Sequence, residues 1–310
     1  MKTLPIKWTR RAFIESLGLL AVGAAITPRD LWGARASPLR RPIPSSGEQI
    51  AVMGMGTSRT FDVGNNPDAA SRLAGVLSVF FEQGGEVIDS SPMYGTSETV
   101  LGDLLTRQNT GGLFAATKVW TDGRQAGMDQ MRQSMQRMGV EVMDLMQVHN
   151  LRDWQAHMAT LRQWKSDGKI RYIGITTSHG RYHDELESIM RTETLDFVQF
   201  TYNIEDRTVE ERLLPLAADR GIATLINRPF QRGALFPKVK GQALPEWSDE
   251  FDCSSWGQFF LKFILAHPAV TCIIPATSKI HHMKDNMGAN FGRIPDSTLR
   301  QRMIQYYQSI

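Results

Sequence analysis

The feature that most constrains the fold of this chain is a regular alternation of two kinds of segment from about residue 50 onward. Short stretches rich in Val, Ile, Phe and Thr, typical of buried strands, alternate with longer stretches whose apolar residues recur at helical spacing. Eight stretches are strand-like: residues 49–57, 85–90, 113–120, 143–150, 171–178, 196–203, 222–230 and 270–278. Helical stretches fill the intervals, including residues 68–83, 96–108, 127–139, 155–168 and 208–221. Eight strand and helix units in this length predict an α/β fold of the (β/α)8 TIM-barrel type.

An open, doubly wound sheet that binds a dinucleotide is the alternative to the barrel. Gly54 and Gly56 match the start of the glycine fingerprint of that fold. The position of the third glycine is occupied by Arg59, and no helix opens directly there. The sequence therefore favours the barrel.

The N-terminal region differs in character from the rest of the chain. A basic opening, MKTLPIKWTRR, precedes an apolar run, SLGLLAVGAAI, which is too short for a stable membrane span and has the length found in signal peptides. The stretch TRRAFI resembles the twin-arginine motif, in which an Arg pair, here Arg10 and Arg11, directs folded proteins across the bacterial inner membrane. We predict a twin-arginine signal peptide over residues 1–36, a polar, proline-rich linker over 37–47 and the barrel over 48–310.

This signal has consequences for partners and location. It makes the twin-arginine translocation machinery an expected partner and the periplasm the expected location. After cleavage beside the small residues at 34–36, the mature protein is expected to lack a stable membrane span.

Composition narrows the class of ligand. The net charge is +3, and no stripe of Lys and Arg interleaved with aromatic residues runs through the chain, so nucleic acid is not an expected partner and a small molecule is. No CxxC, HExxH or Cys/His cluster indicates a metal. Cys253 and Cys272 do not make the disulfide framework of a small secreted domain, and the sequence leaves open whether they pair.

Ionisable side chains follow the carboxyl ends of consecutive predicted strands. Asp89 and Tyr94 follow the second strand, Lys118 the third and His149 the fourth. In a (β/α)8 barrel these strand ends meet at one mouth, where active sites are built. Each residue alone has a structural explanation, as a cap, a solvated charge or a packed ring. Their recurrence at equivalent positions favours a shared site.

The chemistry of these groups is that of a tuned proton donor. A tyrosine hydroxyl has an ordinary pKa of about 10 and is a poor donor to a carbonyl oxygen at neutral pH. The ammonium of Lys118 is expected to lower the pKa of Tyr94, while Asp89 holds that ammonium in place and keeps it charged. His149 can donate a hydrogen bond to the substrate oxygen.

In these residues and their positions the sequence resembles the aldo-keto reductases, (β/α)8 barrels that transfer a hydride between a nicotinamide cofactor, usually NADP(H), and a carbonyl. The resemblance runs from MGMGTSR to DNMGAN, and its most specific part is IDSSPMYGTSETVLGDLL. It implies that Asp89, Tyr94, Lys118 and His149 form the catalytic tetrad of the family and that Trp120 lines the substrate pocket.

The resemblance also implies a set of cofactor contacts: Gly56, Thr57, Ser58, Asp89, Thr176, Thr177, Gln199, Asn227, Arg228, Thr277, Ser278, Lys279, His282 and Asn286. Gln199 would bond the nicotinamide amide, and Lys279 is available to a 2′-phosphate. Thr176 and Thr177 stand where the family commonly has Ser-Asn. Asn227 and Arg228 stand where an aromatic residue and a serine are usual, so the stacking platform for the nicotinamide ring is expected to be absent.

The sequence thus predicts an exported NADP-dependent aldo-keto reductase that reduces an aldehyde or ketone, with Tyr94 as general acid. The alternative is a cofactor-binding barrel that acts as a regulatory or binding subunit with little turnover. The missing platform and the lack of an obvious supply of NADPH outside the cytoplasm favour the alternative, and the complete tetrad disfavours it. The irregular interval 230–256 is expected to form a loop over the barrel mouth that helps to select the substrate.

Overall fold

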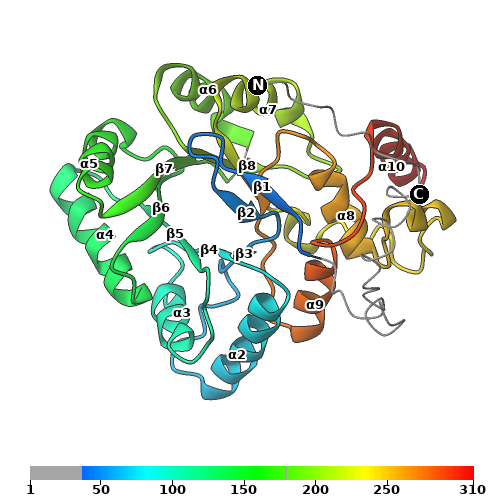
Figure 1. Cartoon of the computed structure of the whole chain (residues 1–310), viewed down its shortest axis with the longest axis horizontal. Helices are drawn as coiled ribbons and strands as arrows, with labels where there is room; N and C mark the ends of the chain where they lie inside the picture. Colours follow the sequence, from blue (N-terminus) through cyan, green and yellow to red (C-terminus); the bar gives the residue numbers. More distant parts are fainter. Residues whose placement is uncertain (1–36, 179) are drawn as a thin grey trace, which may run out of the picture. The chain divides into compact units, whose positions relative to one another are not determined.

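The computed structural model describes residues 37–178 and 180–310, so the predicted signal peptide over 1–36, with Arg10 and Arg11, lies outside the described residues. Eight parallel strands form one sheet in the chain order β3 to β10 (Figure 1). A parallel bridge between Met53 and Ile273 joins the two ends of this sheet and closes it. The predicted (β/α)8 barrel is confirmed.

Each predicted strand overlaps one strand of the barrel. These are β3 (Met55–Gly56), β4 (Val87–Asp89), β5 (Phe114–Val119), β6 (Met143–His149), β7 (Ile170–Thr176), β8 (Phe197–Thr201), β9 (Ala223–Asn227) and β10 (Cys272–Ile273). The surrounding helices are α2 (Pro67–Glu82), α3 (Ser97–Leu105), α4 (Arg124–Met138), α5 (Trp154–Ser166), α6 (His183–Thr192), α7 (Leu213–Arg220), α8 (Trp256–Leu265), α9 (Ile280–Gly288) and α10 (Ser297–Ser309). Within the described ranges, no helix is both long and apolar enough to cross a membrane.

Local sequence signals set the ends of several helices. The side chain of Asn66 accepts a hydrogen bond from the amide of Ala69, and Pro67 occupies the first position of α2. Gly139 ends α4 with φ 68°, a left-handed conformation that glycine adopts without strain. The signals at Asn66 and Pro67 explain why α2 begins close to the start of the helix predicted over residues 68–83.

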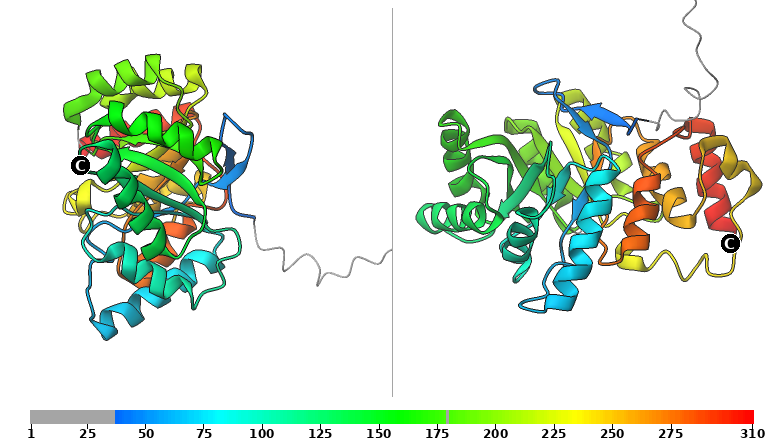
Figure 2. Two further views of the ribbon diagram at one scale, coloured as in Figure 1. Left: turned by 90° about the vertical axis from the view of Figure 1, so that its left-hand side faces the viewer. Right: turned by 60° about the horizontal axis from the view of Figure 1, so that its bottom comes forward.

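An apolar cluster, which we call the floor, fills the barrel near the amino-terminal ends of its strands. Its members are Val87, Phe114, Ala116, Leu145, Tyr172, Phe197, Ala223, Leu225, Cys272 and Ile274, with Ile43 and Ile50 packed against them. These two isoleucines belong to a hairpin of β1 (Arg40–Pro42) and β2 (Gln49–Ala51), which covers this end of the barrel (Figure 2). The floor and the hairpin therefore close this end of the barrel, and the opposite end is where the strand carboxyl ends can form a site.

The hairpin differs from the sequence-based expectation. Residues 40–42 fall in the predicted linker but form β1, and the predicted strand over 49–57 divides into β2, which pairs with β1, and β3, which joins the barrel. The physical reason is burial: Ile43 and Ile50 are almost fully removed from solvent where they cover the floor.

The interval 230–256 is a long connection between β9 and α8. It contains two short helical turns, η3 (Gln231–Gly233) and η4 (Glu246–Phe251). Phe236 packs on Phe260 of α8, and Trp247 packs on Tyr306 of α10. Figure 2 shows the segment at the end of the barrel away from the hairpin, which agrees with the expected loop beside the mouth.

Buried polar groups hold the end of this segment. Lys262, fully buried on α8, donates hydrogen bonds to the carbonyl oxygens of Phe251, Phe291 and Arg293.

Cys253 and Cys272 are both free and buried, so the two thiols do not pair. Burial raises the pKa of the Cys253 thiol to about 11.

Candidate active site

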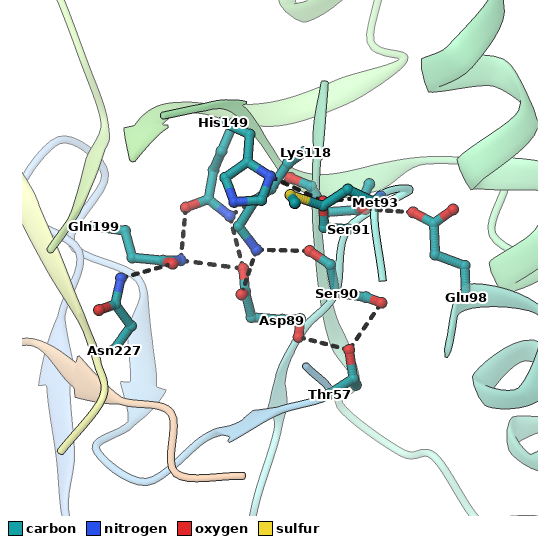
Figure 3. A network of polar contacts seen from close by, with 12 residues as sticks. Thr57, Asp89, Ser90, Ser91, Met93, Glu98, Lys118, His149, Gln199 and Asn227 are labelled. Atoms are coloured by element: carbon teal, nitrogen blue, oxygen red, sulfur yellow. Dashed lines mark hydrogen bonds and ion pairs between the residues drawn. The ribbon is translucent and has the colours of Figure 1, made fainter. Parts of the chain in front are cut away.

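Above the floor, the side chains that point into the barrel change from apolar to polar. Alternate residues of a strand face the same side, so the residues two positions beyond the floor also point inward. On β4, β5, β6, β8 and β9 these residues are Asp89, Lys118, Gln147, Gln199 and Asn227, which we call the polar layer (Figure 3).

Asp89 and Lys118 form a buried ion pair within the polar layer. The Nζ of Lys118 donates to Oδ2 of Asp89 at 2.5 Å and to the carbonyl oxygen of Ser90 at 2.6 Å. The side chain of Lys118 is 0% exposed and that of Asp89 is 3% exposed. Burial alone would lower the pKa of Lys118, but the charge of Asp89, helped by Tyr94, outweighs it and raises that pKa. The ammonium therefore stays charged, as the sequence predicts.

Tyr94 lies in the turn that follows β4, beside this ion pair. Its ring centroid lies 5.2 Å from the Nζ of Lys118 and 5.8 Å from the ring centroid of His149. Burial raises the pKa of Tyr94, and the charge of Lys118 acts in the opposite direction without cancelling it. The expected net lowering of this pKa is therefore wrong, because desolvation of the phenolate outweighs the lysine. The consequence is that Tyr94 keeps its proton at neutral pH.

Asp62 fixes the shape of this turn. Its carboxylate accepts hydrogen bonds from the backbone amide and the hydroxyl of Thr96, both at 2.9 Å. Gly95 has φ 59°, and a Cβ there would lie 2.3 Å from Oδ1 of Asp62. Only glycine fits between Tyr94 and this carboxylate without displacing it.

His149, the last residue of β6, completes the tetrad. Its Nδ1 lies 3.1 Å from the hydroxyl of Ser91, and both residues are buried. Burial, together with the charge of Lys118, lowers the pKa of His149 to about 2. The imidazole is therefore neutral, which suits a hydrogen-bond donor to a substrate oxygen better than a general acid.

Gln147 and Gln199 connect the ion pair to the far side of the barrel. The amide nitrogens of both side chains donate to Oδ1 of Asp89, at 2.8 and 3.2 Å. Figure 3 shows Gln199 between Asp89 and Asn227. Gln199 also donates to the side-chain oxygen of Gln147 at 3.0 Å. The donors of Gln199 are thus used within the protein, and its side-chain oxygen faces Asn227.

Asn227 is an inter-strand link where the family resemblance led us to expect a changed cofactor platform. Its amide nitrogen donates to the carbonyl oxygen of Thr177 at 2.9 Å and to Oε1 of Gln199 at 3.2 Å. Its side-chain oxygen accepts from the hydroxyl of Thr201 at 2.7 Å. Both ends of Asn227 are therefore engaged between β7, β8 and β9.

Trp120, just beyond β5, lies beside His149 with the ring centroids 6.5 Å apart. The guanidinium of Arg152 lies 4.8 Å from the centroid of the Trp120 ring and is itself held by Asp122. The side-chain oxygen of Gln130 accepts a hydrogen bond from the backbone amide of Trp120. The predicted pocket residue is thus held rigidly next to the tetrad.

The candidate cofactor residues of the first strand are already bonded to the protein. The hydroxyl of Thr57 lies 2.9 Å from the hydroxyl of Ser90 and 3.2 Å from the carbonyl oxygen of Asp89. Gly56 lies against β10, where a Cβ would approach the carbonyl oxygen of Ile274 to 3.0 Å. Ser58 follows directly. Gly56 and Thr57 therefore also serve the packing of the barrel.

Other candidates have polar groups to offer a ligand. Thr176 is the last residue of β7 and Thr177 follows it, and their buried hydroxyls have no hydrogen-bond partner among the described residues. Arg228 follows β9 in the left-handed region, with φ 49°. The group after β10 contains Thr277, Ser278 and Lys279, which precede α9, and His282 and Asn286 on that helix.

Three residues that the sequence reasoning missed shape this site: Asp62, Ser91 and Gln147. Gln147 carried a usable signal, because it lies two positions before His149 on the same strand and so faces the same interior. Asp62 and Ser91 carried none, because their contacts depend on how two turns meet in space.

The fold and the site together define a barrel enzyme whose mouth is equipped for proton transfer. Residues 52–301 match the family model described as Aldo/keto reductase family, and the chain belongs to this family.

Individual relatives agree with this assignment. The NADH-specific methylglyoxal reductase of Escherichia coli (strain K12) is 28% identical over 194 residues, which are 52% of this chain and 57% of that protein. An aldo-keto reductase of Strobilurus tenacellus is 24% identical over 253 residues, 69% of this chain and 75% of that one. The chain thus spans little more than half of the first relative and three quarters of the second.

Solved structures share the fold. The holo form of an aldo-keto reductase from Bacillus halodurans superposes with a TM-score of 0.70 at 20% identity, over 87% of this chain and 96% of that one. An aldo-keto reductase from Klebsiella pneumoniae in complex with NADPH has a TM-score of 0.70 at 17% identity, over 87% and 95% of the two chains.

Proposed function

We propose that this protein is an exported oxidoreductase that reduces an aldehyde or ketone with NADPH, and that Tyr94 is its general acid. The observation that carries the proposal is the buried pair of Lys118 and Asp89 next to a protonated Tyr94 and a neutral His149. The NADPH complex of the Klebsiella pneumoniae relative supports the choice of cofactor.

The described residues fit a nicotinamide cofactor in part. The buried hydroxyls of Thr176 and Thr177, which lack partners among the described residues, suit polar groups of a ligand at the end of β7. The oxygen of Gln199 has a second lone pair for a nicotinamide amide. Lys279 is exposed beside the start of α9, where an added phosphate can reach it.

The residues of the tetrad have separate roles in this proposal. The cofactor, when bound, supplies the hydride. Tyr94 gives its phenolic proton to the carbonyl oxygen, and Lys118 stabilises the phenolate that remains. Asp89 keeps Lys118 charged and in place, and His149 donates a hydrogen bond that orients the carbonyl.

Steady-state reduction of a panel of aldehydes and quinones, with NADPH and with NADH, tests the proposed function. We expect at least one carbonyl to be turned over repeatedly by the purified protein. The engaged side chain of Asn227, which cannot stack on a nicotinamide ring, favours a second candidate, a cofactor-binding subunit with little turnover. Cofactor binding without turnover of any carbonyl would establish this second candidate instead.

We predict that Lys279 sets a preference for NADPH over NADH. A charge-assisted contact with the 2′-phosphate contributes about 1.5 to 3 kcal/mol, so Lys279→Gln should weaken NADPH binding by roughly 10- to 100-fold and leave NADH binding unchanged. Fluorescence titration with both cofactors measures this. Lys284→Gln replaces an exposed lysine on α9, the helix that follows Lys279; it is the matched control and should change neither affinity. Equal affinities of the unchanged protein for the two cofactors would remove Lys279 from the site.

We predict that export depends on Arg10 and Arg11. Replacing both by lysine keeps the charge but removes the motif that the twin-arginine machinery recognises, so the protein should remain unprocessed in the cytoplasm. Cell fractionation with detection of the precursor measures this, and Arg29→Lys is the matched control outside the motif. A double variant that is still processed and periplasmic would contradict the assignment.

A further inference from the structure

We propose that Ser91 is a positioning residue that holds His149 in the tautomer with its proton on Nε2. The use of that proton, as a hydrogen bond to the substrate carbonyl, rests on the proposed function. The tautomer itself does not, because it follows from contacts within the protein.

Ser91 lies in the turn after β4, between Asp89 and Tyr94 in the sequence. Its side chain is fully buried, and its hydroxyl oxygen lies 3.1 Å from Nδ1 of His149, on a different strand end (Figure 3). Its carbonyl oxygen accepts a hydrogen bond from the backbone amide of Tyr94 at 3.0 Å. One residue thus contacts the imidazole through its side chain and the turn of Tyr94 through its backbone.

The proton count at the hydroxyl of Ser91 selects the tautomer. The backbone amide of Met93 donates to this oxygen at 3.4 Å, so the oxygen already acts as an acceptor there. If Nδ1 of His149 also donated to it, the hydroxyl proton of Ser91 would have no acceptor among the described residues. A buried donor without a partner is costly. If the hydroxyl instead donates to Nδ1, the buried hydroxyl proton and Nδ1 are both satisfied, and the ring proton is on Nε2, which is left free to donate to a ligand.

The charge state of the ring makes this selection meaningful. Burial and the charge of Lys118 lower the pKa of His149 to about 2, so at neutral pH the ring carries a single proton. A neutral imidazole offers one donor and one acceptor, and the bond made by one nitrogen decides the role of the other. With Nδ1 accepting from Ser91, Nε2 is the donor.

Nitrogen NMR of the ring in the full chain tests the tautomer without reference to activity. With ¹⁵N-labelled histidine, assigned by comparison with His149→Gln, we expect Nδ1 of His149 to show the shift of an unprotonated nitrogen and Nε2 that of a protonated one. Neither shift should change from about pH 5 to 8, where an ordinary imidazole titrates. A protonated Nδ1 in the unchanged protein would overturn the proposal.

Ser91→Ala tests the positioning. Without the hydroxyl, we expect the ring shifts of His149 to move toward a mixture of tautomers and kcat for carbonyl reduction to fall about tenfold, the size expected for one lost hydrogen bond, with cofactor affinity unchanged. Ser134→Ala, which removes another fully buried hydroxyl on α4, is the matched control and should alter neither. Unchanged ring shifts in Ser91→Ala would overturn the proposal. If the wild-type protein shows the expected tautomer but reduces no carbonyl, the proposed function is wrong and the tautomer proposal still stands.

Discussion

Replacing Lys118 by methionine is expected to slow carbonyl reduction by about 10²- to 10⁴-fold and to lower the free energy of unfolding by about 3 to 5 kcal/mol. The rate falls because Tyr94 loses the cation that stabilises its phenolate. Stability falls because Asp89, 3% exposed, is left as a buried charge without a counter-ion. Steady-state kinetics and urea unfolding measure the two effects.

The double variant Lys118→Met with Asp89→Asn separates these effects. It removes the uncompensated charge, so most of the lost stability should return while the rate stays low. In the reverse reaction, oxidation of an alcohol, Tyr94 must act as a phenolate base. The loss of Lys118 raises the pKa of Tyr94 further, so the oxidation rate of Lys118→Met should recover in part at higher pH. A double variant that regains both stability and rate would show that Lys118 acts on folding alone.

The barrel was predictable because its cause is repeated along the sequence. Each unit has its own apolar run and its own amphipathic helix, so an error in one unit leaves the count intact. The first unit is where the prediction of boundaries failed. QIAVMGMGT reads as one strand, but Ile50 is needed over the floor, and only the spatial arrangement of the hairpin with Ile43 shows this.

The proximity of Asp89, Tyr94, Lys118 and His149 was predictable for a related reason. In parallel strands of a barrel the carboxyl ends lie at one mouth, so order along the chain translates directly into proximity. The direction of the pKa shift of Tyr94 was not predictable, because it depends on the balance between desolvation and the charge of Lys118. The sequence shows the charge but not the burial. The contact of Ser91 could not be predicted either, because it depends on the distance between its hydroxyl and His149, which lies on a different strand end.

Asn227 shows how a substitution can be visible in sequence while its consequence is not. The loss of an aromatic platform was expected from the residue type. Its hydrogen bonds to Thr177, Thr201 and Gln199 show in addition that the replacement ties three strands together and orients Gln199. The site thus brings Asp89, Tyr94, Lys118 and His149 together while Asn227 stands where an aromatic residue was expected from the family resemblance. The carbonyl panel tests whether these four residues support the proposed turnover.

Removing only the hydroxyl of Tyr94, by Tyr94→Phe, is expected to lower the rate of carbonyl reduction by about 10²- to 10⁴-fold, the usual contribution of a general acid. The aromatic ring that packs edge-on against His149 remains, so folding and cofactor affinity should change little. Because burial raises the pKa of Tyr94, the rate of the unchanged protein should be constant through neutral pH and fall only as the pH rises through that raised pKa. Steady-state and single-turnover kinetics across pH measure both effects.

Tyr172→Phe is the matched control for Tyr94→Phe, since it removes a tyrosine hydroxyl from the same barrel at the opposite end. The hydroxyl of Tyr172 bonds to Glu48 and Ser46 at the floor, so its loss should cost about 1 kcal/mol of stability and leave the rate unchanged. A Tyr94→Phe variant that binds cofactor normally and reduces carbonyls within a few-fold of the unchanged protein would mean that the proton comes from another group. A neutral His149 is a poor general acid, so the donor would then be the ammonium of Lys118 or solvent, and the rate of Lys118→Met would distinguish the two.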